Sequence, residues 1–153
     1  MKRVLGGLFT LAAAVALLLG IPLSKHGAFA AHASKVPCTV ATLKGNYGFT
    51  FNGYQAVTGP HGGTRNVPFV GAGLYTFDGA GNVVGTFALS LNGQITENVP
   101  YAATYTVNPD CTGSAVGIGN GDSADFVIVK DGAEFLAVDT SSGESLTVDA
   151  KKQ

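Results

Sequence analysis

The sequence predicts an all-β protein: a single antiparallel eight-stranded up-and-down barrel or meander, preceded by a signal peptide helix. Three observations predict this class. An apolar leader comes before two small-residue cleavage sites. After the leader, apolar and polar residues alternate with a period of two in short runs separated by turns rich in Gly, Asn and Asp. No stretch repeats its apolar residues at the three-and-four spacing of an amphipathic helix.

Residues 1–33 are typical of a signal peptide. Two basic residues precede the almost continuously apolar stretch Val4–Leu23, and Ala-x-Ala sites predict cleavage after Ala30 or Ala33. An uncleaved membrane anchor is the alternative, because the stretch approaches the length of about 20 residues that spans a bilayer. Glycines and a proline interrupt the stretch, and this favours cleavage. We therefore expect a secreted or periplasmic protein, with a barrel domain over residues 34–153 and no stable membrane insertion after cleavage.

Eight strands are expected in the barrel domain. The first four have clear alternation of aromatic or branched residues with small or polar ones, which is typical of half-buried strands. They are Tyr47–Phe51, Gly73–Phe77, Phe87–Leu91 and Val99–Val107. The second half of the domain repeats the pattern less regularly. Its expected strands are Ser114–Gly119, Ser123–Lys130, Ala133–Asp139 and Glu144–Ala150.

The connections between these strands predict their arrangement. Most are short and contain residues that tolerate positive φ, such as Asn92-Gly93 and Asp131-Gly132. Such short connections require neighbouring strands to be antiparallel, and closure into a barrel removes the two exposed edges. The connection Ala56–Pro68 is expected to be the longest loop, and loops of this length are often functional or mobile.

Two cysteines, Cys38 and Cys111, predict a disulfide, because an exported chain folds in an oxidising compartment. In an up-and-down order both cysteines fall at the same end of the barrel, which we name the bottom. A catalytic or metal-binding thiol is the alternative, but the chain has no CxxC motif and few histidines. Any ligand mouth is expected at the opposite end, the top. The top loops are Ala56–Pro68, Asn92–Asn98, Gly119–Ser123 and Thr140–Gly143.

The charge of the domain excludes two classes of partner. Removing Lys2, Arg3 and Lys25 with the leader from nine cations leaves six against ten carboxylates, a net charge of about −4. Nucleic-acid binding needs clustered Lys and Arg, so we expect no nucleic-acid partner. Adhesion to anionic lipid is disfavoured for the same reason.

Four segments carry a resemblance to a known group of proteins. They are Gly45–Phe51, Tyr75–Asn82, Tyr105–Gly113 and Asp125–Val129. The segment Y-T-V-N-P-D-C-T-G at Tyr105–Gly113 is the most specific. The chain resembles small secreted bacterial proteins of unknown function that look like barrels of the allene oxide cyclase and calycin-like kind. The resemblance implies the fold and the extracytoplasmic setting. The catalytic residues of the plant cyclase match no motif in this sequence, and the absence of tryptophan makes lipocalins and avidins less similar.

Polar residues near the top loops are the candidate ligand contacts. His61 and Arg65 could form an anion-binding or acid–base pair on a lid, or could belong to a solvated glycine-rich loop. The segment Gly117–Asp125 superficially resembles a calcium-binding repeat, but a single copy favours a hairpin turn. We expect no catalytic residue, no metal and no cofactor. The mouth candidates are His61, Arg65, Gln94, Glu97, Asn120 and Asp122.

Aromatic residues on alternate positions leave the interior undecided. They could pack as a filled core or line an apolar cavity, because an eight-stranded barrel has room for side chains alone or for one small ligand. The residues are Tyr47, Phe49, Phe51, Tyr75, Phe77, Phe87, Tyr101, Tyr105 and Phe126.

Three functional hypotheses follow from the sequence. The first is an exported barrel without catalytic residues that binds a small apolar or amphipathic ligand. The second is a structural or protein-interaction module with a filled barrel, which fits a homo-oligomer. The third is a cyclase or isomerase acting on a hydrophobic substrate, as the resemblance implies. Such an enzyme needs a buried acid, and Asp125 and Glu134 lie within predicted strands.

Overall fold

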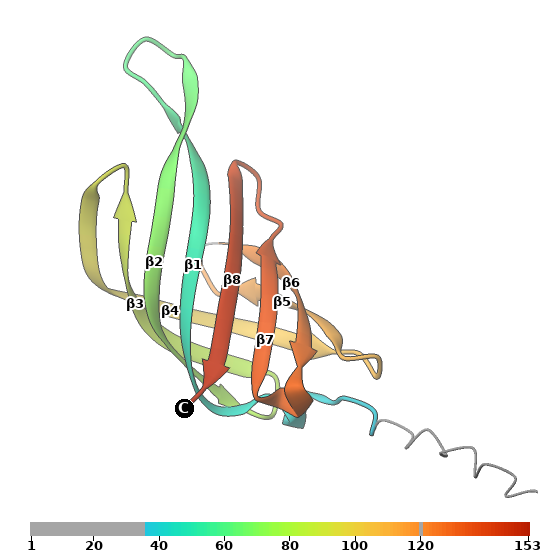
Figure 1. The fold of residues 1–153 in the computed structure, drawn as a ribbon. Helices are drawn as coiled ribbons and strands as arrows, with labels where there is room; N and C mark the ends of the chain where they lie inside the picture. The colour runs from blue at the N-terminus through green and yellow to red at the C-terminus, as the bar shows by residue number, and fades with distance from the viewer. Residues whose placement is uncertain (1–35, 120) are drawn as a thin grey trace, which may run out of the picture. The chain divides into compact units, whose positions relative to one another are not determined.

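A computed structural model describes residues 36–119 and 121–153, and the predicted signal peptide helix lies outside this range. Eight antiparallel strands close into a barrel in sequence order, so that β8 pairs with β1 (Figure 1). The predicted up-and-down barrel is confirmed. None of the helices formed by the described residues has the length and apolarity needed to cross a bilayer. The strands are β1 (Lys44–Thr58), β2 (Thr64–Asp78), β3 (Asn82–Leu91), β4 (Gln94–Val107), β5 (Thr112–Gly117), β6 (Ser123–Val129), β7 (Glu134–Asp139) and β8 (Glu144–Lys152).

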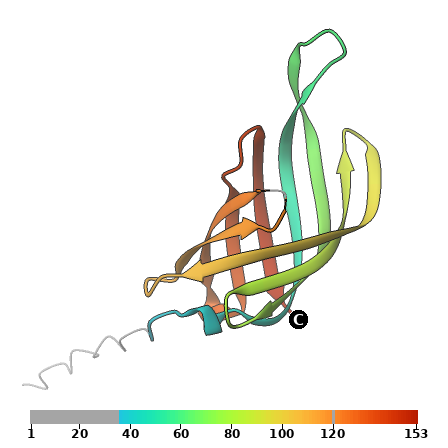
Figure 2. The same ribbon diagram turned by 180° about the vertical axis from the view of Figure 1, so that it is seen from behind.

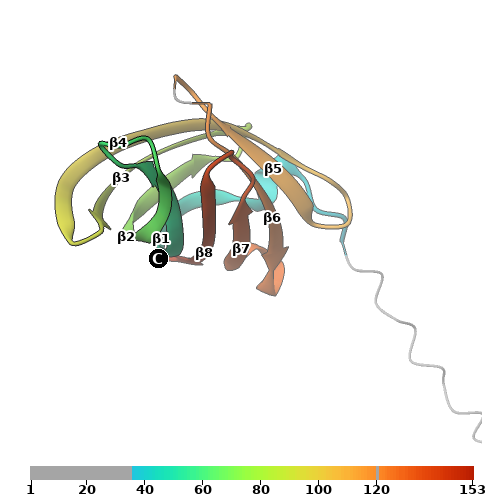
Figure 3. The same ribbon diagram turned by 90° about the horizontal axis from the view of Figure 1, so that it is seen from above.

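The period-2 pattern sets which side chains enter the barrel. In β1, Tyr47, Phe49 and Phe51 are buried, while Thr50 between them is exposed. The same alternation runs along β2 to β4, where the aromatic positions face inward and small residues such as Ala72 face outward. Viewed from above, β4 forms the curved wall of the barrel opposite β1, β8 and β7 (Figure 3). Aromatic burial is the main source of apolar stabilisation in this barrel.

The lower half of the barrel is a packed aromatic core. Phe77 lies at its centre, with its ring centroid 5.2 Å from Tyr47, 5.2 Å from Tyr105 and 5.6 Å from Phe135. Three of these rings meet Phe77 edge to face, the arrangement that the aromatic quadrupole favours. In this half of the molecule, the aromatic stripe packs as a core that leaves a chamber of about 50 Å³.

A plug closes the bottom of the barrel. The 3₁₀ turn η1 (Val40–Thr42) leads into Leu43, which is fully buried. The Tyr105 hydroxyl donates toward the carbonyl oxygens of Val40 and Leu43, at 2.9 and 3.0 Å. The predicted disulfide between Cys38 and Cys111 is present, with 5.0 Å between the Cα atoms, and ties the plug to the β4–β5 turn. Both cysteines therefore lie at one end, as predicted.

The expected long loop Ala56–Pro68 is mostly strand, and that prediction was wrong. β1 and β2 continue through it as a hairpin in which Val57 pairs with Arg65, so only Gly59–Gly63 forms the turn. The hairpin projects beyond the neighbouring strands in Figure 1. The expected loop Asn92–Asn98 behaves in the same way, because β4 begins at Gln94 directly after a tight turn. In both hairpins each strand pairs its backbone along the edge that faces the other strand.

The barrel wall opens between β4 and β5. These strands pair only from Ala103–Val107 to Gly113–Gly117, and β4 runs diagonally across the back of the barrel (Figure 2). Within the described residues, the first half of β4 has no strand neighbour on this side. Pro100 lies in that half, which suits a residue without a backbone N–H donor. The opening positions the cavity described below.

Candidate functional site: an aromatic and acidic cavity at the barrel mouth

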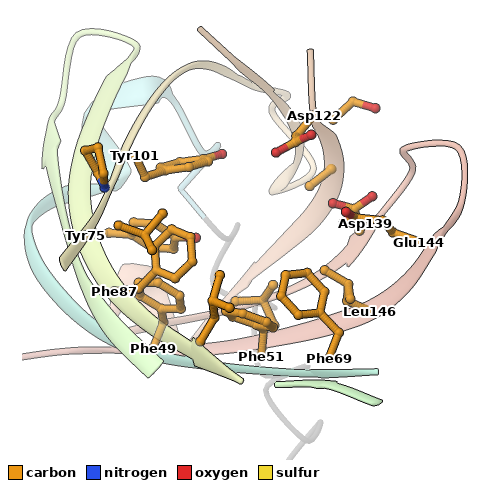
Figure 4. Close-up of a pocket in the computed structure, with 16 residues that line it drawn as sticks. Phe49, Phe51, Phe69, Tyr75, Phe87, Tyr101, Asp122, Asp139, Glu144 and Leu146 are labelled. Carbon is orange, nitrogen blue, oxygen red and sulfur yellow. The ribbon is translucent and has the colours of Figure 1, made fainter. Parts of the chain in front are cut away.

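A cavity of about 270 Å³ opens at the top of the barrel, where β4 diverges from the strands that follow it (Figure 4). Its wall combines an aromatic side from β1 to β4 with an acidic side from the β5–β6 turn, β7 and β8. The lining residues are Phe49, Phe51, Phe69, Tyr75, Phe87, Leu89, Val99, Pro100, Tyr101, Asp122, Ser123, Ala124, Asp139, Glu144, Leu146 and Val148.

The aromatic side of the cavity is built from rings that pack against one another. Phe49 stacks on Tyr75 with 3.7 Å between ring centroids, and Phe51 meets Phe69 and Phe87 edge to face at 5.0 and 5.8 Å. These rings are therefore held as a continuous apolar surface.

Gly71 makes room for one of these rings. A Cβ at this position would lie 2.4 Å from the Phe51 ring and 2.5 Å from the Ala88 carbonyl oxygen. A real Cβ does not approach other atoms so closely, so the missing side chain at Gly71 is what lets Phe51 lie against β2. The upper cavity wall depends on this glycine.

Two tyrosines form the floor of the cavity. The rings of Tyr75 and Tyr101 lie 5.2 Å apart, and both residues also line a smaller chamber of about 50 Å³ beneath the mouth cavity. Within the described residues, the Tyr75 hydroxyl makes no hydrogen bond. Burial raises the pKa of both hydroxyls, and the neighbouring Asp139 raises them further. Both groups therefore remain neutral hydrogen-bond donors at physiological pH.

The acidic side comes from residues at the ends of strands. Asp139 ends β7 and continues the inward face of Phe135 and Ala137, so its carboxylate enters the cavity at the rim. Glu144 begins β8 on the same face as the buried Leu146. Because strands of an antiparallel pair meet at their shared turn, the β7–β8 connection brings these two acids side by side (Figure 4).

Burial and mutual repulsion act on these acids. The Gln55 amide donates to Glu144 Oε1 at 3.0 Å, and the backbone N–H of Ser141 donates to Asp139 Oδ1 at 2.6 Å. The pKa of Glu144 is raised first by burial and then by the negative charges of Asp139 and Asp122. Within the described residues, Asp139 and Glu144 form no ion pair, and no Lys, Arg or His lines the cavity. The cavity is therefore a site of uncompensated negative potential.

Metal binding is not what the acids are arranged for. Among residues 36–119 and 121–153, no group of three or more His, Cys, Asp or Glu side chains is placed to hold a metal ion. The acids of the cavity are spread along its rim, and do not converge on one point (Figure 4). A single compact cation would not reach the tight oxygen coordination that calcium or magnesium requires.

The mouth candidates occupy different places. Asp122 lines the cavity. His61 lies in the projecting turn and Arg65 on the exposed hairpin, while Gln94 and Glu97 are exposed near the start of β4. None of these four lines the cavity, and Asn120 lies outside the described residues. The structure thus brings Asp122 together with Asp139 and Glu144, but not with the other described candidates.

The acids named for an enzymatic interior, Asp125 and Glu134, do not lie inside the barrel. Asp125 is exposed on β6, between the inward Ala124 and Phe126. Glu134 is only 9% exposed but pairs with Lys130 and with Lys151, and the Lys130 ammonium lowers its pKa. The acids that do face the cavity are Asp139 and Glu144. Continuing the inward alternation to the last residue of β7 and the first of β8 would have found them.

Comparisons with known proteins do not identify the chain. No protein-family model matches it, and no curated protein matches it at a significant level.

Proposed function

We propose that this chain is an exported β-barrel that binds a small amphipathic molecule in the mouth cavity. One observation carries the proposal: the bottom of the barrel is plugged by Leu43 and a packed aromatic core, whereas the top holds a cavity with one apolar and one charged wall. An open cavity with a few polar groups on an apolar lining is the usual form of a small-molecule site.

The size of the cavity limits the ligand. An apolar cavity of about 150 Å³ accepts one benzene molecule, and this cavity measures about 270 Å³. The occupant is therefore a molecule of one or two rings, or a short alkyl chain, with a polar end at the rim. The small chamber below the Tyr75–Tyr101 floor adds depth for a narrow apolar tail.

The setting of the protein is part of the proposal. The apolar leader predicts export, and the Cys38–Cys111 disulfide supports folding in an oxidising compartment such as the periplasm or the extracellular space. The carrier would meet its ligand outside the cytoplasm.

Ligand capture tests the proposal. The protein purified after export is analysed by native mass spectrometry for bound small molecules, and is titrated calorimetrically with naphthylethanol as a neutral amphipathic probe. We expect one molecule bound per chain. Leu89→Trp, at the cavity rim, should abolish binding, while Leu74→Trp on the exposed outer face of β2 should not. Equal binding by both variants would show that the ligand binds outside the cavity.

The same titration tests the cyclase or isomerase alternative. Chemical analysis of the recovered ligand distinguishes binding from conversion, because a carrier returns its ligand unchanged and an isomerase returns a rearranged product. Asp139 and Glu144 are the acids within reach of a bound molecule.

A protein-interaction module is the second candidate, and the unpaired edge of β4 favours it. The residues Gln94–Tyr101 leave one row of backbone groups without a neighbouring strand among the described residues, and Ile95 there is 73% exposed. Such an edge can pair with a strand from a second chain. Sedimentation velocity should then detect a dimer that Ile95→Lys dissociates, and a monomer at all concentrations would reject this candidate.

A further inference from the structure

The two walls of the mouth cavity differ in charge, and this asymmetry constrains the ligand beyond its size. Asp122, Asp139 and Glu144 come from the β5–β6 turn, the end of β7 and the start of β8, and all line one side. The opposite side is made by the Phe and Tyr rings of β1 to β4 (Figure 4). No described lining residue carries a positive charge, and Asp139 and Glu144 form no ion pair with the described residues.

We infer that the cavity selects an organic cation: a primary or secondary ammonium group carried on a small aromatic or alkyl body. This inference rests on the proposed function and specifies its ligand class. The ammonium lies at the rim against Asp139 and Glu144, and the apolar body lies against Phe49, Phe51 and Phe87. An ammonium has up to three donors and can therefore bond to more than one carboxylate at once.

The aromatic floor favours a cation for a separate reason. The faces of aromatic rings carry partial negative charge, and a cation within about 6 Å of a ring centroid is attracted to it. Tyr75 and Tyr101 line the same cavity as the acids, and their ring centroids lie 5.2 Å apart. The hydroxyl of Tyr75, which bonds to no described residue, is a further polar group pointing into the cavity and available to a ligand.

The same features disfavour other ligand classes. A carboxylate or phosphate ligand would meet the acidic side without a basic residue to bind it. A neutral ligand would leave the negative charges of Asp139 and Glu144 buried against it without compensation, which is costly. A metal ion does not fit, because the acids do not converge into a coordination sphere within the described chain.

Three probes with the same ring system test the inference. Naphthylethylamine, naphthylethanol and naphthylacetate are titrated into the purified protein at neutral pH and low salt. We expect the amine to bind about tenfold more tightly than the alcohol, a difference of about 1.4 kcal/mol, because its hydrogen bond to a carboxylate is charge-assisted. The acetate should bind most weakly. Asp139→Asn and Glu144→Gln should each weaken amine binding about tenfold and should not weaken alcohol binding, because each removes a charge that a neutral ligand leaves uncompensated.

Matched controls separate the site from the surface charge. Asp125→Asn and Asp149→Asn remove a carboxylate from the outer faces of β6 and β8, and neither should change the affinity for the amine by more than about twofold. The affinity for the alcohol is measured in every variant, because retained alcohol binding shows that the cavity is intact. This readout shows directly whether a loss of amine binding comes from lost charge or from a lost fold.

The outcomes distinguish the inference from the proposed function. Tighter binding of the alcohol or the acetate than of the amine would overturn the cationic ligand class while leaving a small-molecule carrier standing. Failure of all three probes to bind would overturn both. Amine binding that survives Asp139→Asn and Glu144→Gln unchanged would overturn the assignment of the cation to this cavity.

Discussion

The side-chain amide of Gln55 donates a hydrogen bond to the carboxylate of Glu144, with 3.0 Å between Nε2 and Oε1. These two residues are paired across the β1–β8 ladder, at the last position where β8 accompanies β1 before the β1–β2 hairpin continues alone. The bond fixes the acid at the point where the closed barrel becomes an open mouth. It satisfies only one of the two oxygens of the carboxylate, and the described residues offer this acid no ion pair.

Glu144→Gln should stabilise the ligand-free protein at neutral pH. Burial and the charges of Asp139 and Asp122 raise the folded-state pKa of Glu144, so its ionised form costs the folded state free energy above that pKa. The cost disappears once pH falls below the unfolded-state value of about 4.3. The melting temperature of the variant should therefore exceed that of the wild type at neutral pH and converge with it in acid.

Asp149→Asn is the control for this experiment, because Asp149 lies on the same strand but is exposed. Its melting temperature should follow the wild type closely. A larger advantage of Glu144→Gln in acid than at neutral pH would contradict the assignment of the raised pKa.

Binding of an organic cation should weaken as pH falls. The ammonium stays charged, with a pKa near that of lysine at about 10.4, so the change comes from the carboxylates. The groups that face Glu144 are Gln55, Asp122 and Asp139, and its pKa is raised first by burial and then by the two acids. Loss of affinity should therefore begin at a higher pH than an exposed glutamate would give. Titration calorimetry of naphthylethylamine across pH checks this, and a flat profile would reject it.

Gly71→Ala should destabilise the barrel by about 1–3 kcal/mol, the cost of overpacking a well-filled interior. The new methyl group would collide with the ring of Phe51 and with the backbone of Ala88, which cannot both move. Gly63→Ala is the matched control, since nothing lies within 4 Å of a Cβ placed at that position. Urea unfolding of both variants measures the difference in their free energies of unfolding. Equal values would show that the atoms around Gly71 shift to accommodate the methyl group.

Removing the disulfide should lower stability while leaving the cavity in place. Cys38 and Cys111 are 73 residues apart, and the chain-entropy model gives about 4 kcal/mol for a loop of this size. The bridge lies at the bottom of the barrel and the cavity at the top. The double variant Cys38→Ala/Cys111→Ala should therefore unfold at lower urea yet bind the naphthyl probes with unchanged affinity. Weaker binding by the folded variant would mean that the plug and the mouth are coupled.

The local pattern of the sequence was enough to predict the barrel. Alternation at Tyr47, Phe49 and Phe51 required a strand with one buried and one solvent-exposed face. Short turns such as Asn92-Gly93 required neighbouring strands to be antiparallel. The disulfide between the two cysteines was predicted from export to an oxidising compartment, the strand order allowed it, and the structure confirms it. These predictions succeeded because they depend on residues close together in the chain.

Predictions about the mouth were less successful for a physical reason. Glycine and proline near His61 suggested a long loop, but Val57 and Arg65 continue the ladder and shorten it to a turn. Whether a strand ends or continues depends on the hydrogen-bond partner it finds, and a one-dimensional pattern does not contain that partner. The predicted site residues therefore lay mainly on expected loops, whereas Asp139 and Glu144 lie at strand ends.

By itself the sequence determined the all-β class and the antiparallel arrangement of neighbouring strands, because period-2 alternation and turn chemistry are local properties, whereas the structure decided that the aromatic face points inward. Only the tertiary structure decided how far each strand extends, where the barrel opens, and that Asp122, Asp139 and Glu144 share one side of one cavity. They meet because the β5–β6 and β7–β8 turns lie at the same end of neighbouring strands, and the divergence of β4 from β5 leaves the cavity open beside them. Closure of the whole barrel sets that geometry, and no single segment encodes it.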